Sequence, residues 1–188
     1  LHRMRSVRVL VGLWLGLVVG AAFAFDDADR DRLSAENHCV GCDLRALDLS
    51  GADLAGANLW RARLYDADLS GADLRGANLR GAFLARSDFT GANLSAIDGR
   101  RAKFVTAVLT DTRFDKARLI GTDFTTSELA NASFRGADLR RARFFRANLR
   151  GADFTGAILG GTDFLKADLS GATWIDGKTI CPEGSIGQ

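Results

Sequence analysis

The chain has 188 residues, the length of one domain, and its 25 basic and 23 acidic residues nearly balance. With 21 glycines but a single proline, its composition excludes a proline-rich disordered chain. Three arginines fall within residues 1–24, so the remainder carries 22 basic and 23 acidic residues. This balance excludes a general nucleic-acid binder and a strongly acidic nucleic-acid mimic.

Residues 1–24 are predicted to be a secretory signal peptide. Three arginines precede an apolar run over residues 9–20, and residues 22–24 (Ala-Phe-Ala) supply a small-x-small cleavage pattern. The alternative is a membrane anchor, but about 15 apolar residues are short against the roughly 20 that a bilayer span needs. We therefore expect a secreted or periplasmic bacterial protein that is cleaved near Ala24 and has no membrane contact after signal removal.

Residues 42–176 follow a strict period of five. Every fifth residue from Leu44 is Leu or Phe until Trp174 ends the series, with one exception at Gly99, and a small residue, usually Ala, stands two residues before each. We number the five positions of each pentad from this small residue, so that the bulky residue is the third. A period of five matches neither a helix nor a flat strand, and it predicts a solenoid.

The pentads Ala72-Asp73-Leu74-Arg75-Gly76 and Ala152-Asp153-Phe154-Thr155-Gly156 resemble the pentapeptide repeat family, and the resemblance covers 135 of 188 residues. It implies an all-β, right-handed quadrilateral β-helix with four pentads per coil and with the first and third positions inward. From Phe104 onward Phe and Leu alternate, which independently indicates twenty residues per coil and two Phe columns. The 27 pentads then form about seven coils. We interpret Gly99 and the large Ile97 before it as an exchange of volume between two inward positions.

The segments that flank the repeats are predicted to be caps, because a solenoid exposes apolar interior and unpaired backbone at its ends. Residues 25–41 are charged and predict an N-terminal cap with a short helix around Leu33, and residues 177–188 predict a C-terminal tail or cap.

Four outward sides follow from the twenty-residue coil, and two are candidate partner faces. One side is acidic, and the side opposite it is basic. The basic side carries Arg61, Arg80, Arg100, Arg101, Arg118, Arg140 and Arg141. A third, aromatic-basic side includes Tyr65, Phe83, Val105, Arg143, Phe145 and Arg146. Mixed aromatic and arginine surfaces are typical of interfaces, although an ordinary solvated face is the alternative.

Cys39 and Cys42 form a C-x-x-C pair where the repeats begin. In an exported protein they predict a disulfide that joins the N-terminal cap to the first coil, with two reduced thiols as the alternative. With His38 they offer only three metal ligands, so we expect no metal site. Cys181 lies at the other end of the repeats, too far away to pair with either cysteine.

The sequence therefore predicts a non-catalytic exported scaffold that binds a protein partner or has a structural role. His38 is the one histidine after residue 24, and no constellation of catalytic residues accompanies it, so we expect neither enzyme activity nor a cofactor. We expect no nucleic-acid partner, and a homodimer through one end of the solenoid is compatible with the family resemblance.

Two alternative functions are weaker. The first is DNA mimicry that binds gyrase and protects against quinolones, which the resemblance suggests but which the export signal and the mixed charge disfavour. The second is an ice- or wall-binding surface on a ladder formed by Ser50, Ser70, Thr90, Thr110 and Ser170.

Overall fold

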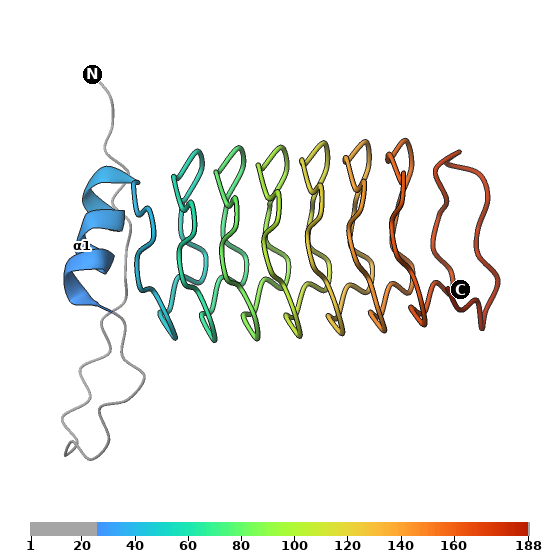
Figure 1. The fold of residues 1–188 in the computed structure, drawn as a ribbon, viewed down its shortest axis with the longest axis horizontal. Coiled ribbons are helices and arrows are strands. Elements are labelled where there is room, and N and C mark those ends of the chain that lie inside the picture. Colours follow the sequence, from blue (N-terminus) through green and yellow to red (C-terminus); the bar gives the residue numbers. More distant parts are fainter. Residues whose placement is uncertain (1–25, 188) are drawn as a thin grey trace, which may run out of the picture.

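The chain folds into a stack of coils with a helix at one end (Figure 1). The computed structural model describes residues 26–187, so the predicted signal peptide lies outside the described residues. Within them, α1 (Asp27–Glu36) is the one helix, and the β-structure consists of isolated bridges. In this described part of the chain, no helix has the length and apolar character needed to cross a membrane.

Parallel bridges join the second positions of pentads that lie 20 residues apart, as from Asp48 to Asp68 and from Asp68 to Asp88. Two backbone hydrogen bonds flank each bridge: the Leu49 N–H donates to the Asp68 carbonyl (2.7 Å), and the Asp68 N–H donates to the Leu47 carbonyl (3.0 Å). Twenty residues is the interval that the sequence pattern predicts. The architecture is therefore β-helix-like, with one bridge residue per pentad instead of long strands.

The fourth and fifth positions of each pentad form the turn between bridges. The Ala52 N–H donates to the Leu49 carbonyl (3.0 Å), and Gly51 between them has a φ of 62°. A positive φ at the third residue of a four-residue turn defines type II, which favours glycine. Thr106 and Thr126 nevertheless adopt φ values of 57° and 56° at this position. Stacking of the coils thus overrides the local preference of β-branched residues.

The interior consists of stacked columns of the residues at the first and third positions. Phenylalanine rings one coil apart stack face to face at 4.9–5.3 Å, and rings of the two columns meet edge to face. The two columns are formed by Phe104, Phe124, Phe144 and Phe164, and by Phe114, Phe134 and Phe154. All of these side chains are completely buried except Phe164, which is partly buried near the C-terminal end. Offset and edge-to-face rings stabilise one another beyond the area that they bury.

Gly99 occupies a bulky position, yet the space there is filled. A Cβ atom added to Gly99 would lie 2.8 Å from Leu119 Cδ2 and 3.2 Å from Ile97 Cδ1. Ile97 and Leu119 are both completely buried. The large side chain at the first position therefore takes the volume that the third position gives up.

The N-terminal end of the stack is covered by α1. Leu33 of α1 is buried against the core. The Asp43 N–H, which has no preceding coil to pair with, donates to the Asp29 carboxylate (2.8 Å), and the Asp43 carbonyl accepts from the Asp26 N–H (3.1 Å). The cap therefore supplies the hydrogen bonds that a preceding coil provides elsewhere.

The coil geometry begins five residues earlier than the expected boundary between residues 41 and 42. His38 bridges to Asn58, Gly41 takes the left-handed turn conformation, and Cys39 is completely buried at the third position. The sequence pattern missed this pentad because a cysteine stands where Leu or Phe was expected.

The C-terminal end is covered by residues 179–187. This segment pairs antiparallel to the last coil, through bridges from Thr173 to Ile180 and from Asp168 to Ile186. Its carbonyl groups accept hydrogen bonds from the N–H groups of Leu169 and Trp174, among others. These bonds pair the edge of the last coil between Lys166 and Trp174, while Leu159, Phe164 and Trp174 stay partly exposed at this end.

Candidate functional site

The basic side divides into paired and unpaired arginines. The Arg100 guanidinium lies 2.6 Å from the Asp98 carboxylate, and Arg140 lies 2.6 Å from Asp138. Arg118 lies 3.9 Å from Asp98, at the limit of an ion pair. In each of the two close pairs, arginine at the fourth position folds over aspartate at the second position of its own pentad.

These pairs lower the pKa of both carboxyl groups. At Asp138 the hydrogen bonds from Arg140 are the main cause of the lowered pKa. At Asp98 partial burial acts to raise the pKa, but the hydrogen bonds and the charge of Arg100 outweigh it, so the pKa is lowered. Both aspartates stay ionised near neutral pH and cancel the charges of their arginine partners.

The other four arginines of the basic side form no ion pair within residues 26–187. They are all exposed, and they are Arg61, Arg80, Arg101 and Arg141. Three of them, Arg61, Arg101 and Arg141, stand at the left-handed fifth position, and within residues 26–187 none of the three pairs with the second position of its own pentad. The basic side is therefore not uniform: its excess positive charge comes mainly from this subset.

On the aromatic-basic side, the predicted residues form two small clusters instead of one continuous patch. Tyr65 and Phe83 stack at 5.8 Å, and the Lys103 ammonium lies 5.4 Å from the Phe83 ring centre. Arg146 lies 5.2 Å from the ring centre of Phe145 in the second cluster. Cations placed over aromatic faces in this way are attracted by the ring quadrupole.

Val105 is half-buried beside Phe104, and Arg143 approaches Asp123 at 3.8 Å. Trp60 is a residue that the sequence pattern did not single out. Its indole is 40% exposed on the basic side, with Arg61 at 4.9 Å from the ring centre. The sequence feature that could have identified it is a tryptophan at the outward fourth position, where a large aromatic side chain is expected to be exposed.

On the acidic side, the aspartates stabilise their own turns. The Asp48 carboxylate accepts from the Ser50 N–H (3.0 Å) and from the Ser50 hydroxyl (2.7 Å). Asp88 binds Thr90 in the same way, at 2.8 and 2.6 Å. These bonds are the main cause of the lowered pKa of Asp48. The acidic residues there have a structural role that explains their recurrence.

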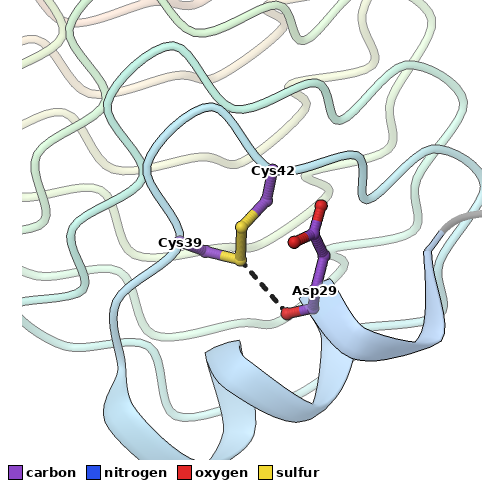
Figure 2. A group of neighbouring side chains, drawn as sticks. All are labelled: Asp29, Cys39 and Cys42. Carbon is purple, nitrogen blue, oxygen red and sulfur yellow. Dashed lines mark hydrogen bonds between the residues drawn. A yellow bond between two sulfur atoms is a disulfide. The ribbon is translucent and has the colours of Figure 1, made fainter.

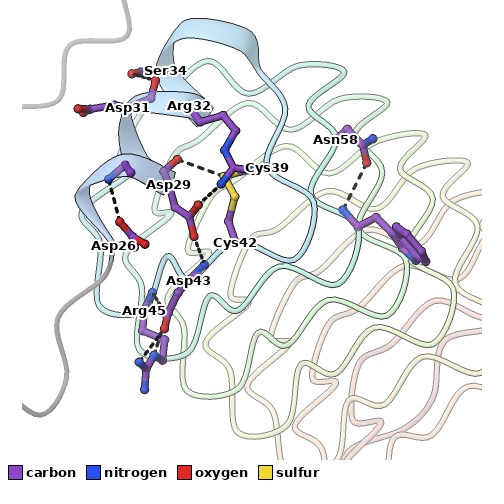
Figure 3. The surroundings of a disulfide bond; sticks show 12 residues. Asp26, Asp29, Asp31, Arg32, Ser34, Cys39, Cys42, Asp43, Arg45 and Asn58 are labelled. Carbon is purple, nitrogen blue, oxygen red and sulfur yellow. Dashed lines mark hydrogen bonds and ion pairs between the residues drawn. A yellow bond between two sulfur atoms is a disulfide. The ribbon is translucent and has the colours of Figure 1, made fainter.

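Cys39 and Cys42 are joined by a disulfide, with the Cα atoms 5.2 Å apart (Figure 2). The Cys39 sulfur contacts the Asp29 carbonyl of α1 at 3.2 Å; because a disulfide sulfur has no hydrogen, this is a contact and not a donated hydrogen bond. Figure 3 shows the disulfide beside α1, next to Asp29 and Arg32. Cys181, at the other end of the rod, is free.

Asp29, Cys39 and Cys42 bring three potential metal-ligand atoms within 4.8 Å of one another. The third residue of this group is Asp29 and not His38, which the sequence had suggested. Disulfide sulfurs carry no thiolate charge, and three ligands leave a tetrahedral site incomplete. The residues present therefore fit a disulfide and not a metal centre. Because the coil geometry begins before Cys39, this disulfide joins two pentads of the first coil, and the expectation that it joins the cap to that coil is wrong.

The comparisons with known proteins agree with this architecture. The family model described as pentapeptide repeats matches eight copies, over residues 42–81, 67–104, 107–144 and 147–173. The chain therefore belongs to the pentapeptide repeat family. No comparable match was found among curated proteins.

Solved structures include similar chains. HetL, a pentapeptide repeat protein involved in heterocyst differentiation regulation from Nostoc sp. strain PCC 7120, is 33% identical over 73% of this chain and 65% of its own length, with a TM-score of 0.48. Thus the chain spans slightly less than two thirds of HetL. Full-length QnrB1, a plasmid-mediated fluoroquinolone resistance protein, is 24% identical over 74% of this chain and 79% of its own, with a TM-score of 0.60. The likeness to QnrB1 shows the fold alone.

Proposed function

We propose that the chain is an exported, non-catalytic scaffold that binds an acidic protein partner along its basic side. The observation that carries the proposal is the set of exposed, unpaired arginines at positions 61, 80, 101 and 141. The two acidic groups of this side, Asp98 and Asp138, are already engaged by Arg100 and Arg140. A partner's carboxylates can therefore approach the remaining guanidinium groups without displacing an internal pair.

The neighbouring aromatic residues supply apolar contact area beside these charges. Trp60 is exposed next to Arg61, and the Tyr65–Phe83 pair lies beyond it on the adjacent side. Tryptophan, tyrosine and arginine dominate the binding energy of many protein interfaces. In this proposal the scaffold is a right-handed β-helix of about seven coils, and residues 1–24 direct its export.

Two other functions lack this support. The hydroxyl groups of Ser50, Thr90 and Ser170 donate to their own aspartates, so the proposed Ser/Thr ladder for ice or wall binding is largely committed to the turns. A DNA-mimic role requires a predominantly acidic rod, whereas this rod has an unpaired basic row. The N-terminal end is covered by α1, whereas Leu159, Phe164 and Trp174 stay partly exposed at the C-terminal end. We assign the acidic partner to the basic side because the unpaired arginines lie there, and a homodimer through the C-terminal end stays a separate prediction.

A charge-reversal experiment tests the proposed face. The variant with Arg61, Arg101 and Arg141 changed to Glu is used as bait with a periplasmic extract, beside the unmodified protein. The control changes Arg75 and Arg135, which form ion pairs on another side, to Glu. We expect partners to be lost from the first variant and retained by the control. Retention of every partner by the first variant would overturn the assignment.

Export is tested separately by mass spectrometry of the protein from fractionated cells. We expect a periplasmic or secreted species that begins at Phe25. A cytoplasmic protein that retains residues 1–24 would refute the export part and leave the assignment of the face untouched.

A further inference from the structure

A longer period is superimposed on the pentads along one corner of the rod, which we call the basic corner. At intervals of 40 residues the sequence reads Arg61-Ala62-Arg63, Arg101-Ala102-Lys103 and Arg141-Ala142-Arg143. Forty residues are two coils, since bridges join residues 20 apart. Every second coil therefore presents two cations at the corner between the basic and the aromatic-basic sides, and successive cation pairs lie about 9.6 Å apart along the rod.

The coils between these cation pairs have glycine at the fifth position, and they differ at the second position of the next pentad. In one coil, Gly81 precedes Phe83, whose ring stacks on Tyr65 and lies beneath Lys103. In the next such coil, Gly121 precedes Asp123, which is much smaller than Phe. A cavity of about 210 Å³ opens at this second level, and it is lined by Arg101, Ala102, Lys103, Gly121, Thr122, Asp123, Arg141 and Arg143.

The positions of these residues explain the cavity. Gly121 has a φ of 66°, and its place for a Cβ lies 3.9 Å from Arg101 Cγ, so the stem of Arg101 leans over a floor that has no side chain. Arg101 with Lys103 forms one wall, and Arg141 with Arg143 forms the other. Within residues 26–187, this is the one level of the basic corner with cation pairs on both sides and no bulky side chain between them.

The charges around the cavity are largely uncompensated. Arg101, Lys103 and Arg141 form no ion pair with any residue between 26 and 187, and all three are exposed. The one acid, Asp123, uses Oδ1 to accept from the N–H and the hydroxyl of Thr125 (3.0 and 2.6 Å). Its other oxygen lies 3.8 Å from Arg143. Four cationic residues thus line the cavity against one carboxylate, and the Lys103 ammonium also contacts the Phe83 ring one coil away.

We propose that this cavity is a binding site for a polyvalent tetrahedral oxyanion of the phosphate or sulfate class. The Gly121 N–H donates to the Arg140 carbonyl, and the Thr122 hydroxyl donates to the Gly99 carbonyl, so the floor offers no free donor there. Recognition then rests on the side-chain cations of the two walls. An anion with two or more charges and several oxygens engages both walls at once, whereas a monovalent anion does not.

The test is a titration followed by NMR on the ¹⁵N-labelled purified protein, with the amide signals of Gly121 and Thr122 as reporters. Inorganic phosphate and tripolyphosphate are the probes, and chloride at equal ionic strength is the control. Saturable shifts are expected at these amides with phosphate. Much tighter binding of tripolyphosphate would identify the source as a phosphate group within a longer polyanion, and similar affinities would identify the free ion.

Three variants separate a built site from general attraction to a basic protein. Arg141→Gln removes one wall cation and is expected to weaken phosphate binding about tenfold. Asp123→Asn keeps the side-chain oxygen that accepts from Thr125 but removes the negative charge, and it is expected to tighten binding about fivefold, the effect of one charge at about 4 Å in water. The matched control is Arg140→Gln, because Arg140 is adjacent in sequence but paired with Asp138; its binding is expected to match that of the unmodified protein.

Absence of saturable shifts with both probes would overturn the proposal, as would equal weakening by Arg140→Gln and Arg141→Gln. The anion site does not depend on the proposed scaffold function, because the NMR titration uses a small ion and no protein partner. Failure of either proposal therefore does not refute the other.

Discussion

The exchange of volume at Gly99 makes a quantitative prediction about coupling. Gly99→Leu restores the regular residue at a bulky position, yet its Cβ alone would lie 2.8 Å from Leu119 Cδ2 and 3.2 Å from Ile97 Cδ1. We expect this substitution to destabilise the protein by about 2–3 kcal/mol through overpacking. Ile97→Ala, which restores the regular small residue, leaves a cavity instead and is expected to cost about 2–4 kcal/mol.

The double variant Ile97→Ala with Gly99→Leu recreates the ordinary pentad, in which a leucine and an alanine fill the layer. It should therefore lie within about 1 kcal/mol of the unmodified protein. The coupling free energy between the two sites is then at least about 3 kcal/mol in the favourable direction, well above the few tenths expected of independent sites.

Urea denaturation followed by circular dichroism measures this cycle. As a control, Ile97→Ala is combined with Thr162→Ala, three coils further along the rod, and these two effects should add within about 0.5 kcal/mol. If the effects of Ile97→Ala and Gly99→Leu also add, the two inward positions do not share one volume, and the explanation of Gly99 is wrong.

The remaining predictions concern the cap, the disulfide and pH. Asp29→Ala removes the acceptor of the Asp43 N–H and is expected to cost about 1–3 kcal/mol; hydrogen exchange should accelerate at Asp43 but not in the central coils, and uniform acceleration would contradict a local capping role. Cys42→Ala places the regular small residue at its site, so the expected loss is that of the short disulfide loop, roughly 2 kcal/mol; the urea midpoint of the unmodified protein should fall on reduction, while the variant's midpoint should be insensitive to reductant. Because the pKa values of Asp98 and Asp138 are lowered in the folded state, the unfolded chain binds protons first as the pH falls. Thermal stability is then expected to be flat with respect to these groups above about pH 5 and to decrease below about pH 4; an increase there would contradict the pairing.

The core of this protein is predictable from sequence because one set of residues both creates the pattern and fills the interior. Leu and Phe at every fifth position are the residues that stack, so the twenty-residue interval and the two Phe columns can be predicted from the amino-acid sequence. The same logic predicted that Ile97 compensates Gly99. It failed at Cys39, where an inward residue does not belong to the repeating set.

The surface was predicted less well, because charge composition does not determine pairing. Arg100 and Arg101 are neighbours in sequence and were assigned to one basic face. Arg100, at the fourth position, forms an ion pair with Asp98 of its own pentad. Arg101, at the left-handed fifth position, does not pair with Asp98. The sequence pattern also gave no indication of the role of Asp29. Its carboxylate accepts the Asp43 N–H in place of the backbone carbonyl that a preceding coil would supply.

The regular core also explains how the basic corner acquires a defined spacing. Long cationic side chains on a flexible loop would take any separation, but here each cation pair is attached to a backbone whose repeat is about 4.8 Å per coil. Placing cations on alternate coils and glycine between them therefore produces a recess at a separation of about two coils, and placing Phe83 in an equivalent recess closes it. Shifting a cation pair by one pentad would move it to a different side of the rod, and shifting it by one coil would fill the floor. The period of 40 residues is thus the shortest period that keeps two walls and an open floor on one corner.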